Sequence, residues 1–320
     1  METGATMTTN YKRMAWFALG FNVLVVVGGA IVKATGSGAG CGEHWPICNG
    51  EVIPRPQQIE TVIEFTHRAT SGLALLIVAA MVVWARRVTR PGDRVRRAAH
   101  WSLGFLIFES LLGALLVLGG WTAMNVSWWR VALQPIHFIN TMILLMFLLL
   151  HAWWATVATP VQWANRPSGF WWRFGVAAVL LMLVNGTGSI ISLGDLLIRE
   201  LGEDSSGLVQ LMYQMRPGHP AIAIGAGAIV VWLTFEKSLS PSASARRWAW
   251  ATAIFVVAQW GVGLLNVVMN VPLWTAMLHL LLADAAWLSL GLWFVTAIER
   301  PEPAPSPVPA DTVGRIASAD

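Results

Sequence analysis

Eight apolar runs of about 20 residues each divide this chain of 320 residues. A run of that length is what an α-helix needs to cross a hydrocarbon core of about 30 Å. Only 12% of the residues are charged and 56% are hydrophobic, whereas a soluble domain carries about 25% charged residues. The pattern predicts an all-α integral membrane protein whose eight transmembrane helices lie at residues 14–34, 62–84, 99–120, 133–157, 172–194, 217–235, 249–270 and 273–298.

Basic residues are distributed unevenly over the loops between these runs. Of the 21 Lys and Arg residues, 15 fall on the side that carries both termini, which is therefore expected to be cytoplasmic. No small-residue cleavage site follows the first run, so we interpret it as a span and not as a signal peptide. The net charge of +4 is explained by topology and by contacts with anionic lipid, and no nucleic-acid partner is predicted.

The only two cysteines, Cys41 and Cys48, fall in the first outer loop. An oxidising compartment outside the membrane favours a disulfide between them. The alternative is a metal site completed by His44. Zinc motifs pair their cysteines much more closely than a spacing of six intervening residues.

The second half of the chain repeats the first at a period of about 150 residues. Glu109 and Gly113 in the third run correspond to Gln259 and Gly263 in the seventh. Four spans separate the members of each pair, which predicts a parallel repeat about an axis along the membrane normal. The expected division is a cytoplasmic tail (1–13), an N-terminal four-helix bundle (14–158), a cytoplasmic linker (159–171), a C-terminal four-helix bundle (172–298) and a proline-rich disordered tail (299–320).

Four of the seven histidines occupy one equivalent position, near the outer ends of the even-numbered spans. A single histidine there is more often a packing residue, but ionisable groups inside a membrane usually face the bundle interior with a partner. Two histidines per bundle at one depth predict ligation of a heme iron in each bundle, and zinc lacks a tetrahedral ligand set at that depth. The four predicted ligands are His67, His137, His219 and His279; His44, His100 and His151 are interpreted as interfacial or structural.

The two halves differ beside these histidines. Glu64 precedes His67 by one helical turn, whereas Arg216 stands in that place before His219. An arginine beside a heme favours a bidentate bond to a propionate, and a carboxylate there favours catalysis by proton transfer or charge stabilisation. The alternative is that Glu64 only pairs with Arg68, four residues on.

Two further carboxylates fall inside the spans. Glu109 is interpreted as a hydrogen-bonding group in the third span, and Asp284 as a neighbour of the heme bound by His279.

Three segments in the first 70 residues carry a family resemblance. GGAIVKATGSG at 28–38, CGEHWPICNG at 41–50 and EFTHR at 64–68 together resemble heme A synthase, in its bacterial form with a cysteine pair. The resemblance covers about residues 14–298, although the second half matches mainly through His219 and His279. Glu109 replaces an expected neutral amide, and Pro220 follows His219 in place of an arginine. Propionate binding in the second half would therefore depend on Arg216.

The resemblance implies an oxidoreductase in the cytoplasmic membrane of a bacterium. Such enzymes oxidise the C8 methyl group of heme O to a formyl group by successive hydroxylations, which gives heme A for terminal cytochrome oxidases. It further implies a permanent heme b on His219 and His279, a substrate heme near His67 and His137, catalysis by Glu64 and a disulfide between Cys41 and Cys48. Arg68 and Arg216 are the candidate propionate-binding residues. The expected partners are an electron donor such as a quinol, heme O synthase, oxidase assembly factors and further copies of the chain.

Two other functions account for part of the pattern. A quinol-linked diheme b-type cytochrome explains four histidines equally well, but not a carboxylate beside the ligand in one half only. A transporter fits eight spans in a parallel repeat, but the sequence predicts no broken helix and no polar site at the midplane.

Overall fold

The structure is a computed structural model that describes residues 7–55, 58–157, 159, 161, 163, 166–202 and 206–299. Eight helical segments within these residues are long and apolar enough to cross a membrane, which confirms the predicted all-α, multi-pass membrane protein. The helices are α1 (Thr9–Ala34), α2 (Ile59–Val88), α3 (Arg94–Leu118), α4 (Trp128–Thr156), α5 (Phe170–Leu201), α6 (Gly207–Gln214), α7 (Gly218–Thr234), η1 (Lys237–Leu239), α8 (Ala243–Val268) and α9 (Leu273–Ile298).

Several helices begin before the apolar runs that identified them. Polar side chains cap their first turns, as Ser127 does by accepting the backbone N–H of Arg130, and such caps satisfy N–H groups that have no partner within the helix. The cap at Ser127 lets α4 begin at Trp128, and α2 begins at Ile59 without a side-chain cap. His67 and His137 therefore lie eight and nine residues into their helices, about 12–14 Å from the helix ends.

The sixth span is interrupted, contrary to the sequence prediction that no span is broken. It consists of α6, which ends at Gln214, and α7, which begins at Gly218. Pro217 stands immediately before α7 and has no backbone N–H to continue a helix. Arg216 falls in this turn, three residues before His219.

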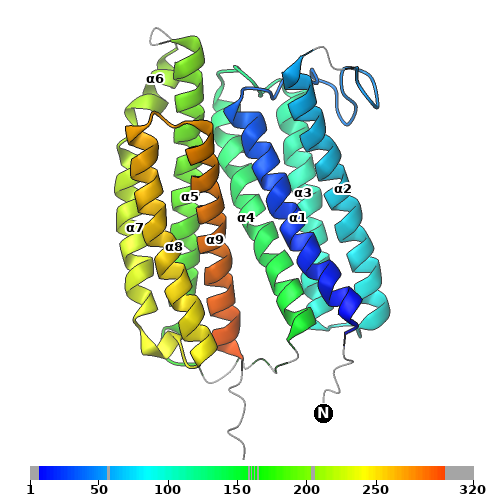
Figure 1. Ribbon diagram of the computed structural model, residues 1–320, viewed down its shortest axis with the longest axis vertical. Helices are drawn as coiled ribbons and strands as arrows, with labels where there is room; N and C mark the ends of the chain where they lie inside the picture. The colour runs from blue at the N-terminus through cyan, green and yellow to red at the C-terminus, as the bar shows by residue number, and fades with distance from the viewer. Residues whose placement is uncertain are drawn as a thin grey trace, which may run out of the picture.

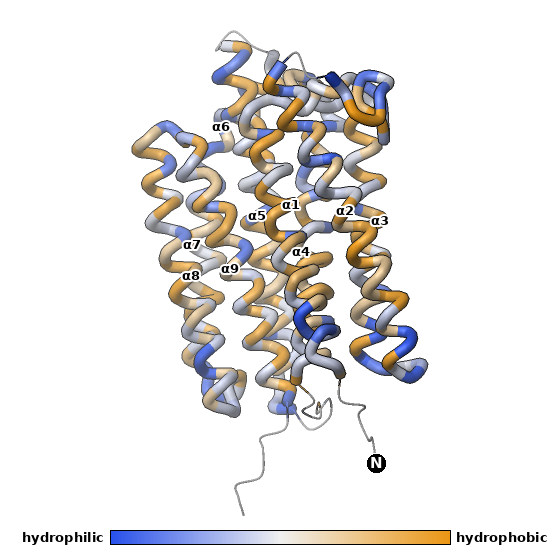
Figure 2. The backbone as a smooth tube through the Cα atoms, turned by 45° about the vertical axis from the view of Figure 1, so that its right-hand side comes forward, coloured by the Kyte–Doolittle hydropathy of each residue, from blue (hydrophilic) through white to orange (hydrophobic). Residues whose placement is uncertain are grey.

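The helices form two groups that stand side by side in Figure 1, with α1–α4 in one group and α5–α9 in the other. The seam between them is closed by α4 against α5 and α9, and by α1 against α9. The loop after α1 and the short helix α6 lie at the same end of the molecule, and the start of α1 and the end of α9 lie at the opposite end. In Figure 2 apolar residues cover the middle of most helices, and polar residues gather towards both ends.

An apolar cavity of about 290 Å³ lies in the seam between α4, α5 and α9. Its aromatic lining consists of Phe147, Trp171, Phe174, Trp287 and Phe294. The residues from α4 follow His137 in the sequence and the residues from α5 belong to its first half, so the cavity lies away from the end that carries the disulfide loop.

The internal repeat, the domain boundaries and the cytoplasmic placement of the termini stay predictions. The predicted disordered tail falls outside the described residues apart from Glu299, as do the first six residues of the N-terminal tail and parts of the linker at 159–171.

Candidate functional site

His67 from α2 and His137 from α4 form the first histidine pair. The two rings lie close enough for a charge on one to act on the other. The His67 ring lies close to α1, because a Cβ atom added to Gly29 would lie 3.0 Å from its Cε1 and one added to Gly28 would lie 3.4 Å from its Nδ1. Glycine at these positions lets the imidazole approach the backbone of α1.

His219 from α7 and His279 from α9 form the second pair, and they too interact electrostatically. Each ring packs against a glycine of a neighbouring helix: a Cβ on Gly188 would lie 2.9 Å from Cε1 of His219, and one on Gly263 would lie 3.3 Å from Cε1 of His279. The members of each predicted pair thus come from two helices of one group, and their role as ligands stays a prediction.

The donor chemistry of the two pairs fits heme iron. The two imidazoles of each pair would supply nitrogen ligands to the iron of a heme, in addition to those of its porphyrin. The Nδ1 atoms of His67, His137 and His279 are buried without a hydrogen-bond partner in the described part of the chain. No group of three or more His, Cys, Asp or Glu side chains among the described residues could hold a metal ion by itself.

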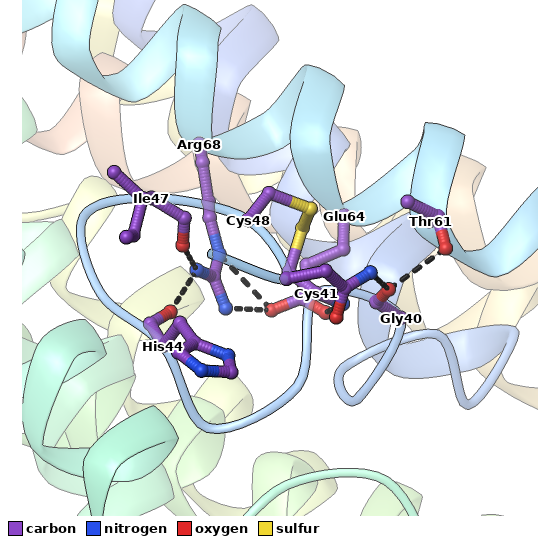
Figure 3. The surroundings of a disulfide bond; sticks show 9 residues. Gly40, Cys41, His44, Ile47, Cys48, Thr61, Glu64 and Arg68 are labelled. Carbon is purple, nitrogen blue, oxygen red and sulfur yellow. Dashed lines mark hydrogen bonds and ion pairs between the residues drawn. A yellow bond between two sulfur atoms is a disulfide. The ribbon is translucent and has the colours of Figure 1, made fainter. Parts of the chain in front are cut away.

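The carboxylate of Glu64 is buried, with 3% of the residue exposed, and it is bonded to its surroundings through both oxygens. Oε2 accepts the backbone N–H of Cys41 at 2.8 Å, and Oε1 accepts Nε–H and Nη2–H of Arg68 at 3.1 and 2.5 Å. The pairing with Arg68 that was the alternative for Glu64 is therefore present. Figure 3 shows the carboxylate between the disulfide and the guanidinium group.

The loop above Glu64 is closed by the predicted disulfide, which joins Cys41 and Cys48. This excludes a metal site built from these two sulfur atoms. Arg68 also donates through Nη1 to the carbonyl oxygens of His44 and Ile47, so its guanidinium joins Glu64 to the loop (Figure 3).

The loop also packs directly on the first turn of α2. Thr61 donates its hydroxyl to the carbonyl of Gly40 at 2.7 Å. A Cβ on Gly40 would overlap the backbone of Glu60, so the approach of the loop to α2 requires glycine at this position. The loop, Glu64 and Arg68 therefore form one connected unit.

Glu109 of α3 is the carboxylate that contacts a predicted ligand. Its Oε1 lies 3.1 Å from Nδ1 of His137. One feature of the sequence pointed to Glu109: in the predicted repeat it stands where the second half has Gln259. This difference did not indicate which histidine the carboxylate would reach.

The outer parts of the two helix groups are joined by polar contacts that the sequence analysis missed. Lys33 donates through Nζ to the carbonyl of Ser189 at 3.0 Å, and Gln134 donates through Nε2 to the same oxygen at 3.2 Å. Ser189 follows Gly188, the residue that packs against His219. Arg216 forms an ion pair with Asp195 at 2.9 Å.

His151 and Asp284 lie apart from these contacts. His151 is fully buried, with its ring nitrogens 3.0 Å from the Tyr11 hydroxyl and 3.0 Å from the Val95 carbonyl, which leaves neither nitrogen for a metal. Asp284 is buried in α9, and its Oδ2 has no hydrogen-bond partner among the described residues.

The sequence of this chain is similar to those of several known proteins. Residues 12–290 match the COX15-CtaA family, described as cytochrome oxidase assembly protein. A protoheme IX farnesyltransferase of Thermus thermophilus is 45% identical over 294 residues, which cover 89% of this chain and 48% of that protein. Heme A synthases of Shouchella clausii and Geobacillus kaustophilus are 44% and 38% identical over 98 and 112 residues, about a third of each chain. The chain thus spans about half the length of the Thermus relative.

Proposed function

The chain belongs to the COX15-CtaA family, the heme A synthase family, and we propose that it oxidises the C8 methyl group of heme O to the formyl group of heme A. Each hydroxylation replaces one C–H bond of the methyl carbon with a C–O bond, and the four electrons that the two steps remove reduce dioxygen, so that a methyl group and one dioxygen give a formyl group and one water. Loss of water from the second product leaves the formyl group. The observation that supports this best is the asymmetry of the two histidine pairs, since only the first lies beneath a loop that holds a buried carboxylate.

In this proposal the second pair, His219 and His279, holds a resident heme b, and the first pair, His67 and His137, receives heme O. Glycines at the contact points support both assignments, because the absence of a side chain there lets an imidazole pack closely against the neighbouring helix. When bound, heme b supplies a redox centre that exchanges electrons with the substrate site. Arg216, in the turn before α7, is the residue we propose for a heme b propionate, and its present partner is Asp195.

The first site acts through Glu64. The N–H of Cys41 and the guanidinium of Arg68 hold the two oxygens in fixed positions, so the carboxylate can take up a proton released at the methyl carbon without first reorienting. Preorganised charge of this kind lowers a barrier more than a mobile group does. Arg68 is also our candidate for a substrate propionate, although its guanidinium already donates to Glu64 and to the loop.

We place the protein in the cytoplasmic membrane of a bacterium with both termini in the cytoplasm. The Thermus relative supports a functional link to a heme O synthase, because its name describes farnesylation of protoheme and about half of its length corresponds to this chain. An electron donor such as a quinol, oxidase assembly factors and a second copy of the chain complete the proposed partners.

A diheme electron-transfer cytochrome is the second candidate. The salt bridge between Glu64 and Arg68 favours it, because a buried carboxylate that already has a cationic partner needs no catalytic explanation. The two functions differ in their products, since only the synthase changes the heme that it binds.

Heme extraction tests the proposal. We expect protein purified from a host that makes heme O to carry heme b together with heme O, its hydroxylated form or heme A, identified by chromatography and mass. Protein from the same host without heme O synthase is the control, and it should carry heme b alone. Two heme b per chain from the first host would contradict the synthase and support the cytochrome.

The disulfide provides a separate prediction. Reduction should lower the rate of heme A formation about 10-fold to 100-fold, the range for misplacing a catalytic group by about 1 Å, because the Cys41 N–H is no longer held at Glu64. The double variant Cys41→Ser/Cys48→Ser should show the same loss and no further response to dithiothreitol. It is a clean control because the chain has no other cysteine. Equal rates for oxidised and reduced protein would contradict the role of the loop.

A further inference from the structure

The first histidine pair has a carboxylate beside one ligand, and that carboxylate is Glu109. Its Oε1 lies 3.1 Å from Nδ1 of His137. The Glu109 side chain is 16% exposed, so neighbouring helices cover most of it.

Two neighbours fix the position of this carboxylate. Asn140 donates Nδ2–H to Oε2 at 2.5 Å, and Thr141 donates its hydroxyl to Oε1. Both residues follow His137 by one turn of α4. The hydroxyl oxygen of Thr141 also lies 3.1 Å from the carbonyl oxygen of His137. The carboxylate is therefore bonded to the helix that carries the histidine.

The other histidines have no comparable partner. His219 Nδ1 lies 3.2 Å from the Thr187 hydroxyl, a neutral group. Nδ1 of His67 and Nδ1 of His279 have no hydrogen-bond partner in the described residues, whereas Nδ1 of His137 lies at ion-pair distance from Glu109, without the alignment of a hydrogen bond. Gln259, which the repeat places opposite Glu109, donates instead to the backbone carbonyl of His279 at 2.8 Å. Among the four predicted ligands, the carboxylate–histidine contact is thus confined to one half of the protein.

We propose that Glu109 is a positioning residue for the substrate heme: its carboxylate, at ion-pair distance from Nδ1 of His137, would accept the Nδ1–H when Nε2 binds the iron and so hold the imidazole in that orientation. This rests on the proposed ligation of heme by His137. A carboxylate partner fixes the tautomer and orientation of a ligating histidine and raises its basicity, and such partners typically contribute about 10-fold to 100-fold in metal affinity. The two heme sites then differ in ligand strength because of Glu109.

The test measures the affinity of hemin for purified protein that already holds its resident heme. Binding is monitored by the absorption spectrum. Glu109→Leu should weaken hemin binding at the first site about 10-fold to 100-fold. The isosteric Glu109→Gln should raise the midpoint potential of the heme at that site, because a neutral amide stabilises the ferric charge less than a carboxylate does. Gln259→Leu is the matched control in the second half and should leave hemin binding unchanged. A change in potential distinguishes ligand positioning from a merely structural role of Glu109 between α3 and α4.

His137→Ala separates this inference from the proposed function. If His137→Ala weakens hemin binding while both Glu109 variants match the wild type in affinity and potential, the positioning role is wrong and ligation by His137 stands. If His137→Ala itself binds hemin as tightly as the wild type, the ligand assignment falls as well. Should Glu109→Leu fail to fold, the potential measured for Glu109→Gln decides the question.

Discussion

Replacing Glu64 with glutamine should lower the conversion of heme O by about 100-fold or more while heme b stays bound. The size follows from the contribution of about 10²- to 10⁴-fold that a positioned proton-transfer group makes to a rate. Glutamine keeps the shape of the side chain and one oxygen that can accept the Cys41 N–H, so the loop should keep its place. The rate is measured as heme A formed per chain, with heme b counted in the same sample. Glu64→Ala should give the same loss.

The control for this variant is Glu60→Gln, four residues earlier on the same helix. It removes a carboxylate from the first turn of α2 without touching the contacts of Glu64, and it should convert heme O at the wild-type rate. Thiol titration of the Glu64→Gln variant should find no free cysteine, which shows that the disulfide is intact. A variant at position 64 that makes heme A as fast as the wild type would remove Glu64 from the mechanism and return it to the role of a partner for Arg68.

Replacing His279 with alanine should remove the resident heme. Partners that only support a ligand contribute about 10-fold to 100-fold in metal affinity, so loss of the ligand itself should cost at least that much. In a host without heme O synthase, the wild type should carry one heme b per chain and the His279→Ala variant a small fraction of that, as measured by the pyridine hemochrome. Conversion of heme O should be lost in parallel, because the second redox centre is missing.

Two comparisons make the His279 result specific. Added imidazole should restore heme binding to His279→Ala, because it can occupy the space of the lost side chain, and a general defect in folding would not respond to it. His100→Gln, which changes a histidine whose ring contacts Arg86 and the Arg96 carbonyl, should keep the wild-type heme content. Full heme b in His279→Ala would show that the second pair does not hold the cofactor.

The sequence predicted the number of spans well because a lipid environment demands long apolar runs, and such runs are visible without knowledge of the fold. It predicted helix ends less well, since caps such as Ser127 are polar and lie outside the runs. The break before α7 was missed for a related reason: Pro217 stands next to an apolar run and does not interrupt one.

The site was predictable where partners are close in sequence. Glu64 and Arg68 are one helical turn apart, and Cys41 and Cys48 lie in one loop, so both contacts could be foreseen. The contact of Glu109 with His137 joins two helices, and the convergence of Lys33 and Gln134 on Ser189 joins two halves of the chain. Contacts of this kind depend on how helices rotate against each other, which the composition of a single span does not determine.

The shared carbonyl of Ser189 also restricts how a large, flat molecule can reach the first site. Hydrogen bonds from Lys33 and Gln134 tie α1 and α4 to α5 beside the histidines, so the seam between the two groups is closed there, and its apolar cavity lies farther along the helices. A porphyrin that binds at the proposed first site would therefore have to reach it by a route other than this closed part of the seam.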